Sequence, residues 1–554
     1  MERTVKQTGP RLALASSLAV LTFALSLAPP GAPPARADAA GRYANPVLFA
    51  DYSDPDVIRV GRDYYLTASS FHFSPGLPVL KSQDLVHWTL VGHVLPTLPF
   101  APEYDMTPPF TLTDAGVHAG PGLRYGGGVW APSIRRHGGL FYVYWPTPDE
   151  GIFMATAKRP EGPWSRPVTV IAGPGLEDPC PFWDQDGRAY LVHSKVGAGP
   201  LILHRLSADG RRVLDAGRVI VDDPKALPIL EGPKLYKRHG WYYIFAPFGG
   251  VERGAQAVLR SRSIWGPYES RVVLRQGATD VQGPHQGGYV ETPSGQGWFI
   301  HFNSAGAFGR IDYLEPVTWR DDWPVIGDPI PGADPAAGQP VASHAMPEVG
   351  GRPEPLHLQD SDEFKGPRLG LQWEWSHNPA PGGWSLAERP GFLRLYAQPA
   401  DDLVTARDTL TQILQGPAMT VTARIDAARM TDGQRAGLAM FSARPSWIGL
   451  VREAGVTRIA YAAAGQETLG PPIAGAAVEL RVEVTPDQTA QYAYRLDQGP
   501  FTPLGPATPL RFSWWKGARP ALFSYVKRAQ AAAPGWIDVD WAHVDHPPAP
   551  APQP

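Results

Sequence analysis

A short unit of sequence, repeated five times between residues 54 and 302, constrains the fold of this chain more than any other feature. Each copy starts with a polar residue, continues into an apolar strand, turns at a glycine and enters a second strand rich in aromatic residues, which is the pattern of a β-hairpin. The turn glycines recur about every fifty residues after one longer first gap, and they are Gly61, Gly138, Gly187, Gly240 and Gly295. An all-strand repeat of this period is typical of propeller blades, so the chain is predicted to be all-β and to contain a five-bladed β-propeller.

The residue that opens each copy is the second informative feature. If the copies are equivalent, the openers occupy the same place in every blade, and in a propeller that place can be the mouth of the central channel. Three of the openers are acids, and the full set is Asp54, Pro132 with Ser133, Asp178, Glu231 and His285. The repeat therefore predicts one pocket that collects acids from distant parts of the chain.

The start of the chain has a different character. Basic residues precede an almost wholly apolar run at 12–28, and Ala35-Arg36-Ala37 follows as an A-x-A cleavage site. This pattern predicts a signal peptide over residues 1–37 and export to the periplasm or the exterior. A membrane anchor is the weaker interpretation, because the run is short and a processing site follows it. We expect no membrane association after the signal is removed.

Composition excludes several classes of function. The formal net charge of −3 and the scattered Lys and Arg residues give no basic patch for nucleic acid. The single cysteine, Cys180, excludes an intramolecular disulfide and zinc sites built on paired cysteines. With 59 glycines and 62 prolines, the chain suits many short strands joined by tight turns.

Changes in pattern divide the rest of the chain. The propeller is predicted over residues 41–330, and the stretch 331–355, rich in Pro, Gly and Ala, is predicted to be an interdomain linker. Short strands that do not repeat the hairpin unit fill residues 356–548, which predicts a separate β-sandwich. The last residues, 549–554, are predicted to be a disordered tail.

Three carboxylates in one pocket have few common uses. One is glycoside cleavage, in which one carboxyl group protonates the leaving oxygen and another activates water. A second is the binding of a hard metal ion by oxygen ligands. A third is hydrogen bonding to backbone amides at turns, as Asp commonly does beside Pro and Gly. Matching positions in three blades favour a functional site over this last interpretation.

The motifs that carry these acids resemble glycoside hydrolase family 43. The resemblance covers residues 45–327 and rests on NPVLFADYSDPDVIRVGRDYYLTASSF, GGGVWAPSIRRHGGLFYVYW, LEDPCPFWDQDGRAYL, EGPKLYKRHGWYYIF, GPHQGGYVETPSGQGWF and GRIDYLEPVTWRDDWPVIG. Through these motifs, the general base of the family corresponds to Asp54 and the general acid to Glu231. The aspartate that modulates the acid and orients the substrate corresponds to Asp178. From Asp360 on, the chain resembles, more loosely, the concanavalin-like β-sandwich of the family's xylosidase branch, in which a sandwich loop helps to close the active site.

The resemblance also implies roles for residues around the acids. Trp130 lies near the site in the family, and Arg310 matches an arginine of the sugar pocket. His285 matches a central histidine often linked to calcium or water, and it is predicted to be a substrate contact. Phe71, Phe73 and Trp130 are predicted to form an apolar wall for one sugar ring, with ordinary core packing as the alternative. The chemistry needs no cofactor. A structural Ca²⁺ with His285 as a ligand is left open, because one imidazole is a poor site for a hard cation without oxygen partners.

The reaction implied by the resemblance is hydrolysis with inversion. Asp54 would deprotonate a water on one face of the sugar while Glu231 protonates the leaving oxygen, which requires the two carboxyl groups to lie roughly 6.5–9.5 Å apart. The expected function is exo-acting release of terminal β-D-xylose from xylo-oligosaccharides or xylan. Removal of α-L-arabinofuranose branches from arabinoxylan or arabinan is the first alternative, because the two sugars present similar hydroxyl layouts.

Other classes of propeller make different predictions. A non-catalytic carbohydrate-binding propeller predicts the loss of at least one of the three acids, whereas all three are present. A protein-interaction propeller predicts no convergent buried carboxylates. The five-bladed fructan hydrolases also begin with an Asp-Pro blade, but Ser53-Asp54-Pro55-Asp56 and Glu231-Gly232 depart from their opening and acid motifs.

Overall fold

The computed structural model describes residues 41–107, 123–332, 336–475, 477–530 and 535–547. The predicted signal peptide and C-terminal tail lie outside the described residues. Within the described ranges strands dominate, and the helical elements are the short 3-10 turns η1 (Pro102–Asp105), η2 (Gly306–Phe308) and η3 (Arg528–Gln530). None of the helices in these ranges has the length and apolar character needed to cross a membrane.

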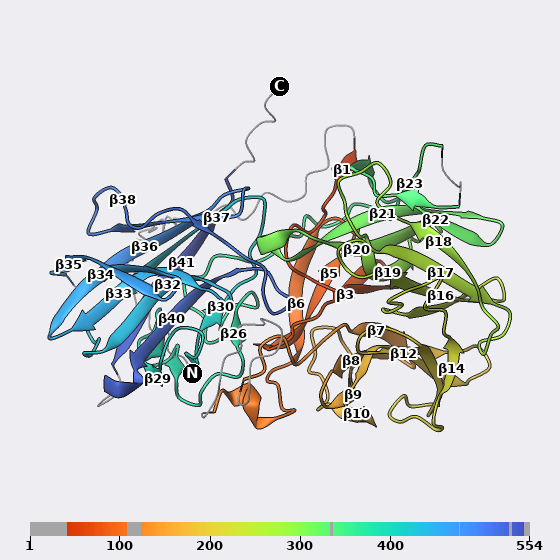
Figure 1. The fold of residues 1–554 in the computed structure, drawn as a ribbon, viewed down its shortest axis with the longest axis horizontal. Coiled ribbons are helices and arrows are strands. Elements are labelled where there is room, and N and C mark those ends of the chain that lie inside the picture. The colour runs from red at the N-terminus through yellow and green to blue at the C-terminus, as the bar shows by residue number, and fades with distance from the viewer. Residues whose placement is uncertain (1–40, 108–122, 333–335, 476, 531–534, 548–554) are drawn as a thin grey trace, which may run out of the picture. The chain divides into compact units, whose positions relative to one another are not determined.

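Five antiparallel sheets form a propeller (Figure 1). Each blade has four strands in chain order, and the fourth sheet gains two short strands from the chain beyond the fifth blade. The blades are β2 (Asp56–Val60), β3 (Asp63–Thr67), β5 (Gly76–Ser82) and β6 (Trp88–Leu95); β7 (Ser133–His137), β8 (Leu140–Thr147), β9 (Gly151–Ala157) and β10 (Val168–Ala172); β11 (Leu176–Trp183), β12 (Ala189–Lys195), β13 (Leu201–Leu206) and β14 (Arg218–Val221); β15 (Lys234–Arg238), β16 (Trp241–Phe248), β17 (Ala255–Ser261) and β18 (Glu269–Leu274), with β23 (Asp328–Pro329) and β24 (Gly338–Gln339); and β19 (His285–Glu291), β20 (Gly297–Ser304), β21 (Arg310–Arg320) and β22 (Trp323–Ile326).

The turn glycines lie where the repeat places them. Gly61 links β2 to β3 and Gly295 links β19 to β20, with φ angles of 67° and 86° that favour glycine over other residues. The other three turn glycines occupy the same connection in their own blades. The prediction of a five-bladed propeller is therefore confirmed.

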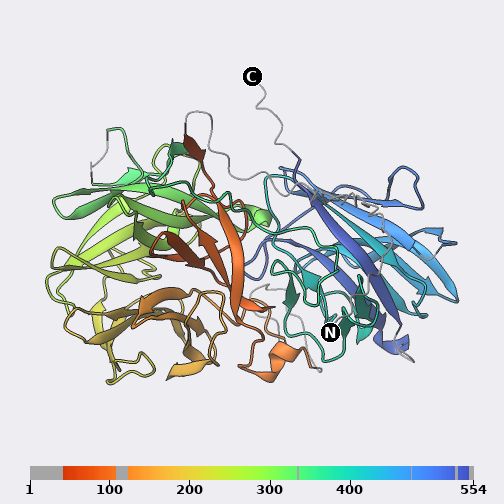
Figure 2. The same cartoon turned by 180° about the vertical axis from the view of Figure 1, so that it is seen from behind.

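The first strands of the blades surround the propeller axis. β2 contacts both β7 and β19, so the ring closes between the first and fifth blades. Figure 2 shows this closure, with the red-orange first blade beside the green fifth blade. The segment before β2 reinforces it, because Leu48 and Asp312 of β21 exchange backbone hydrogen bonds of 3.2 and 2.9 Å.

Part of the stretch predicted as an interdomain linker is paired with the propeller. β24 lies between β18 and β23, and β25 (Ser343–Ala345) pairs with β1 (Arg42–Ala44). The backbone N–H of Val341 also donates to the buried carboxylate of Glu315 at 2.8 Å. These contacts hold residues 338–345 against the blades before the chain enters the second fold.

The C-terminal part is a sandwich of two sheets. The first contains β35 (Gln466–Pro472), β34 (Val456–Ala463), β33 (Ser446–Glu453), β32 (Gln434–Phe441), β40 (Arg519–Lys527), β30 (Leu410–Thr411), β26 (Glu374–Ser376) and β4 (Phe73–Ser74), with β29 (Gln398–Ala400) beside β40. The second contains β27 (Trp384–Ser385), β28 (Leu393–Tyr396), β41 (Trp536–Asp545), β31 (Met419–Asp426), β36 (Ala477–Val484), β37 (Thr489–Arg495) and β38 (Thr502–Pro503), with β39 (Thr508–Pro509) beside β37.

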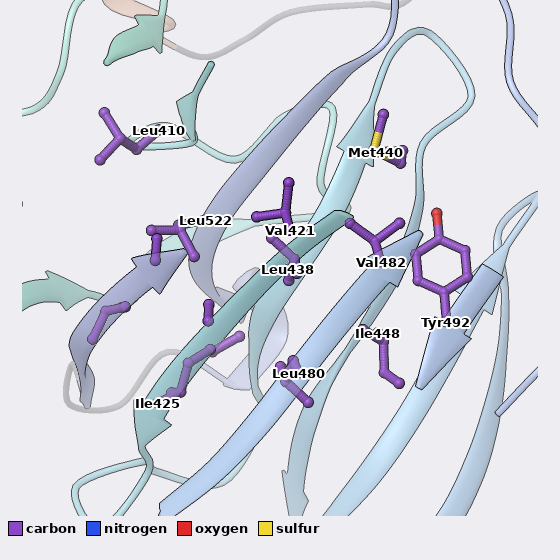
Figure 3. Close-up of a cluster of buried hydrophobic side chains, with 14 of the residues drawn as sticks. Leu410, Val421, Ile425, Leu438, Met440, Ile448, Leu480, Val482, Tyr492 and Leu522 are labelled. Atoms are coloured by element: carbon purple, nitrogen blue, oxygen red, sulfur yellow. The ribbon is translucent and has the colours of Figure 1, made fainter. Parts of the chain in front are cut away.

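Apolar side chains from the two sheets meet in the sandwich core. Val421 and Leu480 from the second sheet lie near Leu438 and Ile448 from the first (Figure 3), and all of them belong to one buried cluster. In β31, alternate residues from Met419 to Ile425 enter this cluster, which is the period-two pattern of a strand with one face in a core. The prediction of a β-sandwich after the propeller is therefore confirmed.

The first blade contributes directly to a sandwich sheet. β4 is inserted between β3 and β5, and it pairs with β26 through Ser74 opposite Trp375 and Phe73 opposite Ser376. The ring of Phe73 is buried there beneath the guanidinium of Arg519, whose central carbon is 3.7 Å from the ring centroid. β4 therefore forms the edge strand of a sandwich sheet, so the propeller and the sandwich are joined through one sheet.

Candidate active site

A cavity of about 230 Å³ lies at the end of the propeller where the acids open the blades. Its wall includes Asp54, just before β2, Asp178, within β11, and Glu231, just before β15. These elements belong to the first, third and fourth blades. The structure thus brings together the three acids that the repeat places at equivalent positions.

Asp54 is held through both of its carboxylate oxygens. The hydroxyl of Ser69 donates to Oδ2 at 2.5 Å, and Arg310 Nη1 donates to Oδ1 at 3.0 Å. The side chains of Asp54 and Arg310 are both buried. This pairing fixes the orientation of the carboxylate in the cavity wall, and it also places Arg310 in that wall, as the family resemblance implies.

Asp178 accepts three hydrogen bonds. The backbone N–H of Gly232 and the hydroxyl of Ser194 donate to Oδ2 at 2.8 and 3.1 Å, and Gln286 Nε2 donates to Oδ1 at 3.3 Å. The donors come from three successive blades, because Ser194 is on β12, Gly232 precedes β15 and Gln286 is on β19. Asp178 therefore links the blades that surround the cavity.

The charge of Asp178 is set mainly by burial and by a neighbouring acid. Burial and then the carboxylate of Glu231 raise the pKa of Asp178 to about 6, while the Gly232 hydrogen bond and the buried ammonium of Lys234 act in the opposite direction. Two neighbouring carboxyl groups resist being ionised at the same time, because their negative charges repel each other. The site therefore retains a proton at a pH where an isolated Asp has lost it.

Glu231 has a histidine as its partner. His285 Nε2 and Glu231 Oε1 share a hydrogen bond of 2.9 Å. His285 is fully buried and is not among the residues that line the cavity, so it supports Glu231 from behind and does not face a substrate. Its role as a substrate contact, implied by the resemblance, does not fit this position.

A calcium ion at His285 would need oxygen ligands around the imidazole. In the described part of the chain, the only three acidic or histidine side chains whose ligand atoms all lie within 4.8 Å of one another are Glu177, Asp178 and Glu231. His285 is outside this group, and its Nε2 is taken by Glu231. These acids, and not His285, are therefore the side chains of the site that offer clustered oxygen ligands, and the buried Nδ1 of His285 has no hydrogen-bond partner among the described residues.

Aromatic rings form part of the cavity wall. Phe71 and Trp130 line it, with ring centroids 6.3 Å apart. Phe73, which was expected beside them, lies outside the wall because β4 pairs it with the sandwich sheet. Trp515 takes the third aromatic position, with its ring centroid 6.3 Å from that of Trp130.

Trp515 comes from the sandwich loop that precedes β40. The next residue, Lys516, is buried, and its Nζ donates to the backbone oxygen of Asp51 at 2.9 Å and to the hydroxyl of Ser53 at 3.1 Å. The backbone N–H of Gly517 donates to Asp51 Oδ2 at 2.9 Å. The sandwich is thus anchored to the segment that carries Asp54, and this loop contributes Trp515 to the cavity wall.

Backbone strain is concentrated in the wall. Asp54, Phe71, Asp178 and Gln286 have φ angles of 57°, 52°, 55° and 37°. Residues other than glycine seldom adopt such angles, and they cluster where the surrounding structure enforces a functional arrangement. The ends of the blades hold these side chains in directions that a regular strand would not give.

Glu177 is a lining residue that the sequence analysis did not predict. Neighbouring residues of a regular strand point to opposite faces, so Glu177 and Asp178 should not share a pocket. The register of β11 against β12 shifts between Glu177 and Cys180, and this irregularity places both acids in the wall. The motif itself carries no signal for the shift.

Buried polar side chains near the starts of the blades also form hydrogen bonds between blades. Asp56 is fully buried and accepts hydrogen bonds from the backbone of Ile134 at 2.8 Å and from Arg135 at 2.5 Å. Lys234 Nζ donates to Pro132 O at 2.8 Å. These hydrogen bonds link residues of the first, second and fourth blades.

The fold and the site together define a glycoside hydrolase, because a sugar-sized pocket with separately held carboxyl groups is what glycoside cleavage requires. The family model described as glycosyl hydrolases family 43 matches residues 43–324. A second model, the beta xylosidase C-terminal concanavalin A-like domain, matches residues 361–545. The chain belongs to glycosyl hydrolase family 43.

Similar proteins match over most of the chain. A putative beta-xylosidase of Xylanibacter ruminicola is 40% identical over 484 residues, which cover 86% of this chain and 85% of the relative. A beta-xylosidase of Formosa agariphila is 34% identical and covers 91% of this chain and 90% of its own. A non-reducing end alpha-L-arabinofuranosidase of Bacteroides ovatus is 32% identical, covering 72% of this chain and 73% of its own.

Solved structures of the family share the fold. An engineered family 43 enzyme with both endo-xylanase and exo-arabinofuranosidase activity superposes with a TM-score of 0.79 at 29% identity, covering 91% of this chain and 100% of its own. A bifunctional GH43-CE protein of Bacteroides eggerthii gives a TM-score of 0.78 at 30% identity over 91% of this chain. The present chain spans 63% of that longer protein.

Proposed function

We propose that the protein is an exo-acting, inverting β-xylosidase that releases terminal β-D-xylose from xylo-oligosaccharides or xylan. The observation that carries this proposal is the convergence of Asp54, Asp178 and Glu231 on one small cavity. The two relatives with the highest identities quoted above are named as a beta-xylosidase and a putative beta-xylosidase, and each matches more than four fifths of this chain.

Asp54 and Glu231 have the two chemical roles. Asp54, oriented by Ser69 and Arg310, takes the proton of a water molecule that attacks the anomeric carbon. Glu231, oriented by His285, gives a proton to the glycosidic oxygen as the bond breaks. Water attacks from the face opposite the leaving group, so the first product has the inverted anomeric configuration.

Asp178 orients the substrate and helps to keep a proton in the site. Its raised pKa reflects burial and then repulsion by Glu231, and a pair of acids that repel each other holds one shared proton over a wider pH range than separate acids do. Gly232 and Gln286 fix its direction. Asp178 therefore need not exchange protons with the substrate to affect the reaction.

Exo action is proposed from the size and closure of the pocket. A volume of about 230 Å³ with aromatic rings from both folds suits a single sugar ring. Trp515, supplied by the sandwich, narrows this cavity beside Trp130. The chain end of the substrate then enters with its terminal residue first.

Removal of α-L-arabinofuranose branches from arabinoxylan or arabinan is the second candidate. One relative is named a non-reducing end alpha-L-arabinofuranosidase, and an engineered structural neighbour has exo-arabinofuranosidase activity. Both sugars are pentoses that the same acids can cleave. The other residues of the cavity wall, and not the catalytic acids, would decide between them.

We further propose that the protein is exported through its N-terminal signal and acts on soluble or cell-wall carbohydrate in the periplasm or outside the cell. The signal-like run and the A-x-A site at 35–37 support this. The near-neutral charge supports a neutral polysaccharide and not a nucleic acid as the partner. The catalytic steps above require no metal.

Parallel assays with 4-nitrophenyl β-D-xylopyranoside and 4-nitrophenyl α-L-arabinofuranoside test the proposal. We expect faster hydrolysis of the xyloside, and NMR of the first product should show α-xylose. Faster hydrolysis of the arabinofuranoside would favour the second candidate. Inactivity of folded protein on both substrates would refute both candidates, and β-xylose as the first product would refute inversion.

A further inference from the structure

Glu177 is the one acid of the cavity wall that the proposed reaction does not use. It lies on β11 beside Asp178, its side chain is buried, and its Oε1 has no hydrogen-bond partner among the described residues. Oε1 is sealed from solvent, and a buried carboxylate with an unpaired oxygen is costly, which favours the neutral carboxyl group, while the place of Glu177 in the cavity lining puts its side chain within reach of a bound sugar.

The surroundings of Glu177 are acidic. Ligand atoms of Glu177, Asp178 and Glu231 all lie within 4.8 Å of one another. In the described ranges no lysine, arginine or histidine forms an ion pair with Glu177, whereas Asp54 in the same cavity wall is paired with Arg310. Burial and the two neighbouring acids raise the pKa of Glu177 far above its ordinary value, and the nearby polar groups of Ala198 and Ser194 offset this only in part.

A neutral carboxyl group can form hydrogen bonds that its ionised neighbours cannot. An ionised acid can only accept hydrogen bonds, but a protonated one also carries an O–H donor. The hydroxyls of a sugar can pair with both functions. A carboxyl group that keeps its proton can therefore bind a sugar hydroxyl in two directions while adding no charge beside Glu231.

We propose that Glu177 is a specificity-determining residue whose protonated carboxyl group donates a hydrogen bond to a ring hydroxyl of the sugar in the cavity. This inference rests on the proposed glycosidase function and extends it. Sites built to hydrogen-bond a substrate hydroxyl discriminate strongly against analogues that lack it, because the polar group of the site is then left unpaired. Glu177 thus selects the hydroxyl pattern of the bound ring.

Two variants separate this role from a purely electrostatic one. Glu177→Gln removes the ionisable group but keeps a donor and an acceptor, and Glu177→Ala removes both. Asp408→Asn is the matched control, because Asp408 is also a buried acid with a raised pKa and an unpaired oxygen, but it lies in the sandwich outside the cavity.

The experiment measures kcat/KM for 4-nitrophenyl β-D-xylopyranoside and its 2-, 3- and 4-deoxy analogues. Wild type should prefer the parent over at least one deoxy analogue by about 10- to 100-fold, and Glu177→Ala should lose this preference by a similar factor. Glu177→Gln should stay within about threefold of wild type, because an amide also donates to a hydroxyl, with an unchanged pH profile. Asp408→Asn should behave as wild type on all four substrates.

Three outcomes would overturn the assignment. In one, Glu177→Ala discriminates among the deoxy analogues as wild type does. In another, Glu177→Gln loses as much activity as Glu177→Ala and shifts the pH profile, which would make Glu177 a charged group that acts through its neighbours. In the third, Glu177→Gln matches Glu177→Ala with an unshifted profile. If Glu177→Ala does not fold, Glu177→Met takes its place as a variant of similar length without a donor.

The failure of this inference is distinguishable from failure of the proposed function. A folded wild-type protein that hydrolyses neither pentoside refutes the function and, with it, the role of Glu177. A wild-type protein that is active, with discrimination that does not depend on Glu177, refutes only the role of Glu177. If the arabinofuranoside is the better substrate, the deoxy series is made on that sugar.

Discussion

Replacing Lys516 by methionine should destabilise the protein by removing the contact that joins the sandwich loop to the first blade. The ammonium group is buried, donates hydrogen bonds of 2.9 and 3.1 Å to Asp51 O and Ser53 Oγ, and lies 3.6 Å from Asp51 Oδ1. Methionine has nearly the same length but no charge and no donor. The variant therefore leaves the Asp51 carboxylate in place without its cation.

The size of the loss in unfolding free energy depends on the hydrogen bonds that the Asp51 carboxylate retains. Removing one partner of a buried ion pair costs about 3–5 kcal/mol. The Asp51 carboxylate retains backbone donors from Gly517 at 2.9 Å and Arg310 at 3.0 Å. The loss of Lys516 also removes the cost of burying an ammonium group, the burial that lowers its pKa. The expected net loss is therefore about 2–4 kcal/mol.

Urea unfolding followed by the fluorescence of the 18 tryptophans measures this loss, with residual activity as a second probe. Lys527→Met is the control, because Lys527 is 43% exposed and lies 4.0 Å from its partner Glu467. Such an exposed pair contributes less than about 1 kcal/mol. A Lys516→Met protein that unfolds at the same urea concentration as Lys527→Met would refute the argument that the buried contact joins the two folds.

Three other changes test the site. Trp515→Ala removes the aromatic ring that the sandwich supplies, so KM for the xyloside should rise about 5- to 20-fold; steady-state kinetics measure this, and an unchanged KM would show that the ring does not touch the sugar. Glu177→Gln should be more stable than wild type at neutral pH. Glu177 has a pKa of about 10 in the native state, against about 4.3 in the unfolded state. Between these two pH values the native state binds more protons, so the free energy of unfolding of wild type falls as the pH rises. Urea midpoints at acid and neutral pH test this, and equal pH dependence of the two proteins would contradict it. Glu231→Ala should lose about 10²- to 10⁴-fold in kcat on xylobiose but far less on 2,4-dinitrophenyl β-xyloside, whose leaving group needs no proton; equal losses would mean that Glu231 is not the acid.

The repeat was sufficient to predict the propeller and the meeting of three acids. Turn glycines such as Gly61 and Gly295 fix where each hairpin begins, and equivalent positions in a ring must converge whatever the distance along the chain. Each of the three acids opens one copy of the repeat, and they are Asp54, Asp178 and Glu231. Their convergence is a consequence of symmetry, which a sequence can show.

The remaining wall depends on local irregularities and on contacts between folds. Glu177 enters the pocket because β11 departs from regular register, and the period-two rule would place it outside. Phe73 leaves the wall because β4 joins another sheet, and Trp515 enters it from a loop more than 450 residues after Asp54. None of these three features belongs to the repeat, so no pattern in the sequence predicts them.

Because β4 of the propeller pairs with β26 of the sandwich, neither domain of this enzyme can be exchanged without disturbing the other. Cutting the chain after the blades would leave the backbone of β4 without its partner strand β26 and would uncover the buried ring of Phe73, and it would take away Trp515 and the ammonium of Lys516 together. A graft of this propeller onto a sandwich from another source would have to reproduce both the strand pairing and the Asp51 anchor. Exchange of sugar specificity between such enzymes should therefore be sought by redesigning the pocket wall within one intact chain.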